Sequence, residues 1–120
     1  GREMRITARM LERKGACEEQ WAWFCLYFGR SAEVTLQNCY EAAALGLNLS
    51  WAAFFLFPQQ PWRKFDRAMD RIRKAVWGKF DRACALTGEE EGRRAVASVW
   101  DGFLRATAMA FYRAATGKEG

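Results

Sequence analysis

The chain has 120 residues, of which 51% are hydrophobic and 15% aromatic, so it is long enough for one buried core and too apolar for a disordered protein. It carries a net charge of +5 and contains no histidine, and it therefore lacks the commonest general base and the commonest metal ligand near neutral pH. We expect one domain over residues 1–120 that is not an enzyme and that binds neither a cofactor nor a metal.

The N-terminal segment shows no secretory signal. Residues 1–3 precede Met4 and are interpreted as a cloning remnant, and the residues from Met4 onward are charged rather than apolar. The longest apolar run, residues 42–57, is interrupted by Asn48 and Ser50 and is shorter than the roughly 18 residues of a membrane span. These features predict a soluble, cytoplasmic protein. In that reducing compartment we expect free, mostly buried cysteines at positions Cys17, Cys25, Cys39 and Cys84.

Four short helices are predicted in the first half of the chain, over about residues 8–14, 17–28, 36–45 and 51–57. Thr7, Thr35 and Ser50 stand where N-cap residues are expected, and Gly15, Gly29 and Gly46 follow the helix ends. Aromatic residues occupy more than one side of the second helix, so we expect it to be covered on more than one side.

Two longer helices are predicted in the second half. The first, over residues 62–86, has an apolar stripe formed by Phe65, Met69, Ile72, Val76, Phe80 and Ala83. The second begins after Gly88, and its buried stripe is predicted to contain Val96, Trp100, Phe103, Thr107, Phe111 and Ala114. No segment alternates apolar and polar residues for long enough to predict a strand. The fold class is therefore all-α: a compact single-domain bundle of about six helices, with four short N-terminal helices packed on a long antiparallel C-terminal pair.

The helix predicted over residues 62–86 contains the whole surplus of positive charge. Residues 1–60 hold six basic and six acidic residues, whereas residues 62–86 hold eight basic and three acidic ones. The candidate partner-binding residues on this helix are Arg63, Lys64, Arg67, Arg71, Lys74, Lys79 and Arg82. Asp66 and Asp70 lie within i,i+3 reach of Arg63 and Arg67, and Asp70 also reaches Lys74, so we expect partial pairing within the helix. Gly78 on the same face leaves room for a second backbone.

Three interpretations of this basic helix fit the pattern: a solvated face, a surface for an acidic protein, and a surface for nucleic acid. Residues 40–57 have the alanine-to-glycine spacing of a helix-turn-helix, but residues 51–57 offer almost no donor or acceptor to base edges. We expect that short helix to plug the core or to form an apolar docking surface. Cys17, which precedes a helix, is the only thiol whose position favours reactivity.

A specific set of residues in the first half forms a recognisable pattern. It comprises Met4-Arg5-Ile6-Thr7-Ala8-Arg9-Met10-Leu11, Lys14-Gly15-Ala16-Cys17, Gln20, Phe24, Phe28-Gly29, Val34-Thr35, Cys39 and Trp51-Ala52-Ala53. Over residues 4 to about 57 the chain resembles small phage and prophage helical proteins of uncharacterised function. The resemblance implies a capped helix, a glycine turn and two packed helices, and it transfers no catalytic residue.

At the level of class, a small helical phage-type protein is similar to the anti-CRISPR proteins and other inhibitors that phages direct against host defence systems. This resemblance implies a location in the host bacterial cytoplasm and a host protein or nucleoprotein complex as partner. A direct, sequence-nonspecific DNA- or RNA-binding accessory protein is the alternative, and a Cys17-dependent enzyme ranks last. Surplus aromatic surface also allows a homodimer.

Overall fold

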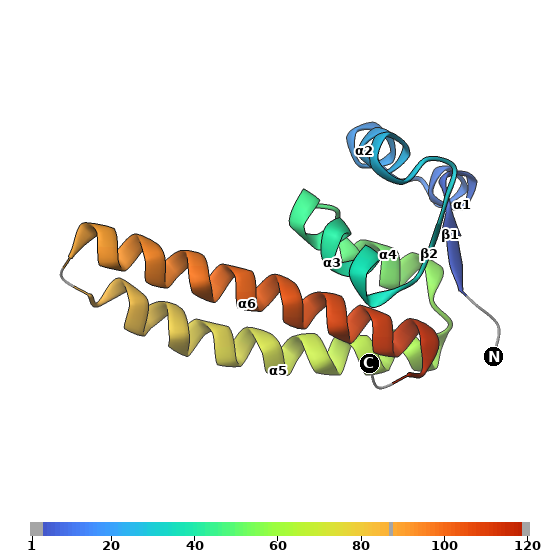
Figure 1. The fold of residues 1–120 in the computed structure, drawn as a ribbon. Coiled ribbons are helices and arrows are strands. Elements are labelled where there is room, and N and C mark those ends of the chain that lie inside the picture. Colours follow the sequence, from blue (N-terminus) through green and yellow to red (C-terminus); the bar gives the residue numbers. More distant parts are fainter. Residues whose placement is uncertain (1–3, 87, 119–120) are drawn as a thin grey trace.

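The computed structural model describes residues 4–86 and 88–118; residues 1–3, interpreted above as a cloning remnant, lie outside this range. The elements in chain order are β1 (Arg5–Thr7), α1 (Ala8–Arg13), α2 (Glu18–Phe28), β2 (Ser31–Glu33), α3 (Leu36–Leu45), α4 (Leu49–Leu56), α5 (Gln59–Cys84) and α6 (Glu89–Thr116). The predicted all-α class, with six helices and a C-terminal pair, is confirmed. The molecule measures 48 × 29 × 22 Å, because the α5–α6 hairpin extends well beyond the head that α1 to α4 form at one end (Figure 1).

The antiparallel packing of α5 on α6 is built on their apolar stripes. Phe65 and Phe111 are almost fully buried, and their rings meet edge to face at 5.9 Å between centroids. Phe57, which follows α4, packs on Phe111 at 4.8 Å and so joins the head to the hairpin. Trp100 was predicted to be buried, but it is 52% exposed. Its ring stacks on that of Phe103, with 5.4 Å between the centroids, and half of the side chain stays in contact with solvent.

The two hairpin glycines Gly92 and Gly78 differ in what lies beside them. A Cβ added at Gly92 would lie 4.0 Å from the carbonyl oxygen of Ala83 on α5. The space beside Gly78 is open: among the described residues, such a Cβ would meet only the side chain of Arg82, on the same helix, at 3.9 Å, so the approach of a partner's backbone at Gly78 stays a prediction. Gly78 lies on the outer side of α5, so no second helix reaches it.

Two short strands were not predicted. β1 and β2 pair antiparallel, with Arg5 opposite Glu33 and Thr7 opposite Ser31. Each strand has three residues, which is too few for an alternating pattern to stand out in the sequence. The pairing ties the start of α1 to the segment that leads into α3.

Helix starts follow the predicted caps at two of three positions. The Thr7 hydroxyl accepts a hydrogen bond from the Met10 amide at 3.1 Å, and the Thr35 hydroxyl accepts one from the Asn38 amide at 3.0 Å. The prediction of Ser50 as the α4 cap was wrong, because the Asn48 side chain accepts from the Trp51 amide at 2.9 Å. α5 also begins three residues earlier than predicted, at Gln59, since Pro61 is tolerated within a first helical turn.

Replacing Asn48 with Ala is expected to lower the free energy of unfolding by about 1 kcal/mol, the usual effect of removing an N-cap side chain. The matched control is Ser50→Ala, which removes a polar side chain two residues away that caps nothing and should change stability by less than about 0.5 kcal/mol. Urea unfolding followed by circular dichroism measures both. Equal losses for the two variants would contradict the assignment of Asn48 as the cap.

Helix α2 is covered on one side only, contrary to prediction. Phe24 is its only buried residue, while Trp23 and Tyr27 are about half exposed and Leu26 is 90% exposed.

The cysteines also differ from expectation: Cys39 is buried and Cys25 half-buried, but Cys17 and Cys84 are exposed. Cys17 precedes α2 and Cys84 ends α5 near the hairpin tip, so neither position faces the core.

A polar contact fastens α3 to α6. Tyr40 Oη donates a hydrogen bond to Asp101 Oδ1 at 2.8 Å, and Arg105 Nε donates to Asp101 Oδ2 at 2.8 Å. The Arg105 guanidinium also lies over the Tyr40 ring, 4.7 Å from its centroid. The hydrogen bonds from Arg105 and Tyr40 lower the pKa of the Asp101 carboxyl.

This contact predicts a pH dependence of stability. The pKa of Asp101 is lower in the folded than in the unfolded chain, so the ionised carboxylate stabilises the folded state. This stabilisation is complete at a pH above the pKa of the unfolded chain, near 3.9, and is lost as the pH falls through the pKa of the folded chain. Asp101→Asn should therefore destabilise the protein more at pH 7 than at pH 3. Urea unfolding of both proteins at the two pH values tests this, and a constant difference would contradict it.

Candidate partner-binding site: the basic face of α5

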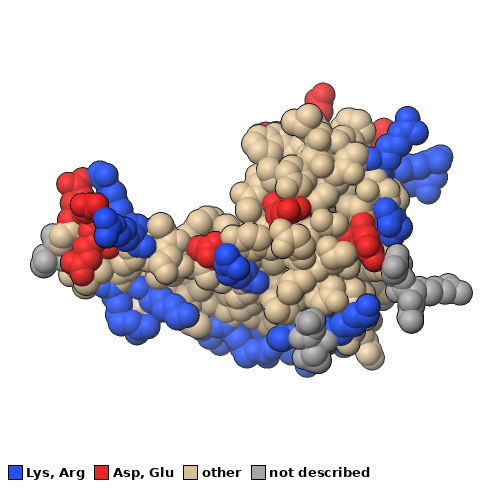
Figure 2. All heavy atoms as spheres, in the orientation of Figure 1, with Lys and Arg blue, Asp and Glu red and all other residues tan. Residues whose placement is uncertain are grey.

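The basic face consists of the seven residues Arg63, Lys64, Arg67, Arg71, Lys74, Lys79 and Arg82 on α5, and all of them are exposed. At 100° per residue, Arg63, Arg67 and Lys74 point away from the buried stripe that faces α6. Lys79 lies nearer the flank of the helix. Figure 2 shows Lys and Arg side chains gathered along the lower edge of the hairpin, over α5, whereas on the upper side acidic and basic side chains lie next to each other.

The predicted pairing within α5 is only partly present. Lys74 Nζ lies 3.1 Å from Asp70 Oδ2, as expected for an i,i+4 pair. Asp66 forms no salt bridge with any described residue, so the predicted Arg63–Asp66 pair is wrong. The residues four positions before and after Asp66 are Trp62 and Asp70, and neither offers a cation at that spacing.

The arginines of the basic face consequently differ from those of α6. Within residues 4–86 and 88–118, Arg63, Arg67 and Arg71 form no ion pair, and their four-residue spacing places like charges next to each other. On α6, by contrast, Arg93 is bound to Glu89 at 2.6 Å and Arg94 to Glu90 at 2.8 Å. Arg93 and Arg94 are therefore paired at the hairpin tip, whereas on the basic face of α5 only Lys74 is paired among the described residues.

A hollow of about 520 Å³ lies at the end of the basic face where α5 begins and α6 ends. Arg63, Lys64 and Arg67 line it from α5, and Arg113 lines it from the last turns of α6. Cations from two helices thus surround one concave surface. Such a site can hold a carboxylate or phosphate group by charge-assisted hydrogen bonds.

Aromatic side chains border the same end of α5: Phe54 and Phe55 are exposed, and Trp62 is half-buried. We call Phe54, Phe55 and Trp62 the aromatic patch: the Phe54 ring lies 5.0 Å from that of Phe55 and 5.2 Å from that of Trp62. Phe54 is 58% exposed, although Ala52 and Ala53 on the same helix are buried. One side of α4 therefore packs in the core, and the other side exposes aromatic rings to solvent. The sequence signal for this was its apolar character all round, which a helix covered on one side cannot bury.

Comparison with known proteins found no match: no family model, no curated protein and no solved structure is significantly similar to this chain. Among the described residues, no helix is both long enough and apolar enough to cross a membrane.

Proposed function

We propose that this protein is a non-enzymatic interaction protein that docks the basic face of α5 onto an anionic surface of a host protein or nucleoprotein complex. In keeping with the resemblance of its first half to phage proteins, we propose that the complex is a host defence complex and that docking inhibits it, as an anti-CRISPR protein does. The observation that carries this proposal is the row of exposed arginines, Arg63, Arg67 and Arg71, without ion pairs among the described residues.

The geometry of α5 suits an extended contact. Successive arginines at four-residue steps lie about 6 Å apart along the axis, and the face from Arg63 to Arg82 spans about 28 Å. Because a helix packed along its length is rigid, these charges are held in place before binding. Repulsion between neighbouring arginines, roughly 0.2–0.5 kcal/mol per pair, is relieved when an anion binds. A one-sided positive field also accelerates encounter with a negative partner.

The neighbouring aromatic patch favours a protein or nucleoprotein partner over a simple polyanion. Aromatic and arginine side chains are enriched among the residues that dominate protein–protein binding energy. Phe54 and Phe55 are exposed beside the start of α5, where the cationic hollow lies. An inhibitor that blocks a partner sterically needs only such a rigid, shaped and charged surface.

Direct binding to DNA or RNA is the second candidate, and the absence of an Arg63–Asp66 pair favours it, since the Arg63 guanidinium makes no ion pair with a described residue and can bind a phosphate. Gel shifts with DNA and RNA across a salt series distinguish it. If the face contacts phosphates, log affinity should fall with log salt with a slope of about −0.9 per phosphate contacted on duplex DNA. No shift of either nucleic acid at low salt would exclude this candidate.

The main proposal is tested by affinity purification from lysate of a bacterial host, comparing the wild-type protein with Arg63→Glu/Arg67→Glu/Arg71→Glu. We expect a stoichiometric protein or nucleoprotein partner with the wild type and its loss with the variant. The matched control, Arg9→Glu/Arg13→Glu/Arg30→Glu, changes charge equally at exposed positions of the head and should retain the partner. Recovery of no stoichiometric partner by the wild type, or equal recovery by all three proteins, would contradict the proposal.

A further inference from the structure

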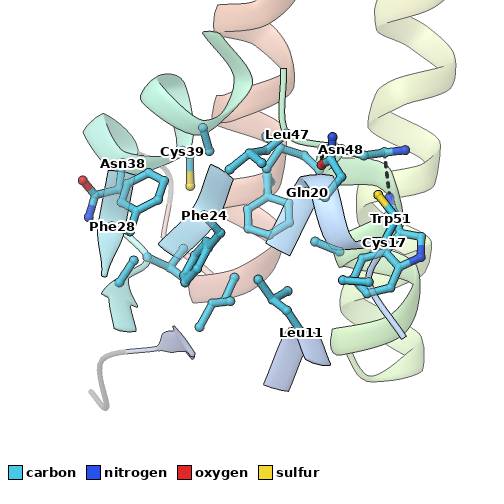
Figure 3. A pocket seen from close by; sticks show the side chains of 18 of the residues that line it. Leu11, Cys17, Gln20, Phe24, Phe28, Asn38, Cys39, Leu47, Asn48 and Trp51 are labelled. Atoms are coloured by element: carbon cyan, nitrogen blue, oxygen red, sulfur yellow. Dashed lines mark hydrogen bonds between the residues drawn. The ribbon is translucent and has the colours of Figure 1, made fainter. Parts of the chain in front are cut away.

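A cavity of about 420 Å³ lies inside the head, between α1 and α2 on one side and α3 and α4 on the other. Figure 3 shows Phe24 and Phe28 from α2 and Leu11 from α1 around the same space as Cys39 from α3. The exposed residues Cys17 and Asn48 belong to the lining, so the cavity meets solvent beside them. Its volume falls within the range of about 300–1,000 Å³ that is usual for small-molecule sites.

Several polar atoms of the lining already bind other groups of the protein. The Gln20 amide nitrogen donates to the Gly46 carbonyl at 3.2 Å, and its oxygen accepts from the Asn48 amide at 2.9 Å. The Asn38 amide nitrogen donates to the Glu33 carbonyl at 2.9 Å. A stable internal water needs two to four polar partners, and the walls formed by Phe24, Phe28 and Leu11 offer none. An apolar occupant suits it better.

The charges of the lining restrict the occupant further. No Lys or Arg is among the lining residues, and Glu33 is the only one with a charged side chain. Burial raises the pKa of the Cys39 thiol to about 12, which keeps it neutral and adds to the apolar wall. A carboxylate or phosphate headgroup would therefore enter without a cation to balance it.

From this cavity and its lining, which is largely apolar and holds no cation, we infer a second binding site in the head, independent of the basic face, that takes one neutral and largely apolar small molecule, such as a medium-chain alcohol or a two-ring aromatic compound. The occupant would fill the space between Phe24, Phe28 and Cys39 and would hold α2 against α3 and α4. This role fits the one-sided packing of α2, of which only Phe24 is buried.

The test uses the neutral fluorescent probe N-phenyl-1-naphthylamine with the full-length folded protein. We expect saturable binding of one probe per chain, displacement by decan-1-ol, and at least tenfold weaker displacement by decanoate at pH 8. Absence of saturable binding, or equal displacement by the alcohol and the anion, would overturn the inference.

Variants locate the probe. Ala42 lines the cavity and is buried, so Ala42→Phe should fill the space and weaken probe binding at least tenfold. Ala44, two residues along α3, is exposed and does not line the cavity, so Ala44→Phe is the matched control and should bind as the wild type does. If Ala42→Phe does not fold by circular dichroism, Ala52→Leu fills the cavity from α4 and is expected to give the same loss. Equal binding by the filled and control variants would place the probe elsewhere and overturn the inference.

Discussion

Replacing Phe111 with Ala is expected to lower the free energy of unfolding by about 4 kcal/mol, within the range for removing a large ring from a packed core. Phe111 on α6 is 2% exposed, and its ring contacts those of Phe65 on α5 and Phe57 after α4. A smaller side chain would leave a void where the hairpin meets the head. Because small domains are stabilised by only about 5–15 kcal/mol, this loss is a large share of the total.

Urea unfolding followed by circular dichroism measures this effect. The control is Phe54→Ala, which removes the same ring from a position that is 58% exposed and should cost less than about 1 kcal/mol. Similar losses for the two variants would contradict the position of the core at the junction of α4, α5 and α6.

Reversing the charges of Arg63, Arg67 and Arg71 to Glu is expected to weaken partner binding by about a hundredfold. Each reversal removes an attraction to the partner and adds a repulsion, which together weaken binding by about 1 kcal/mol at an exposed site. The three reversals therefore cost about 3 kcal/mol of binding free energy, which corresponds to about a hundredfold change in affinity. The loss should shrink as salt rises, because exposed charges are screened. Fold stability should change little, since all three side chains are exposed and unpaired within the described part of the chain.

Titration of the purified partner with the wild type, this variant and the head control Arg9→Glu/Arg13→Glu/Arg30→Glu measures the effect at two salt concentrations. The control has the same net charge as the variant, so it separates the position of the charges from their sum. Equal weakening by both triple variants would indicate a general electrostatic effect and would contradict a specific basic face.

The sequence predicted those parts of the fold that depend on local signals. The stripes containing Phe65 and Phe111 define the hairpin, and the caps Thr7 and Thr35 lie where local polar side chains bind the first free amides. Asn48 and Ser50 are both good cap residues close together, and tertiary contacts, including the bond between Gln20 and the Asn48 amide, decide between them.

The sequence predicted which residues form the basic face, but it did not predict which of their side chains form salt bridges. Spacing alone allowed Asp66 to pair with Arg63, whereas the side-chain geometry of α5 leaves both without a salt bridge to any described residue. The hollow with Arg113 and the cavity under α2 depend on how distant segments come together, which periodicity does not encode. The exposure of Trp100 has the same origin, since it depends on how distant segments pack around α6.

Lysine acetylation of the free protein and of its complex with the recovered partner, read by mass spectrometry, tests the basic face most directly because it needs no substitution. Lys64 and Lys74 lie on the basic face, whereas Lys14 is exposed in the head. We expect Lys64 and Lys74 to be protected from acetylation in the complex and Lys14 to react as in the free protein. Protection of Lys14 with unchanged reactivity of Lys64 and Lys74 would contradict the basic face of α5 as the partner-binding surface.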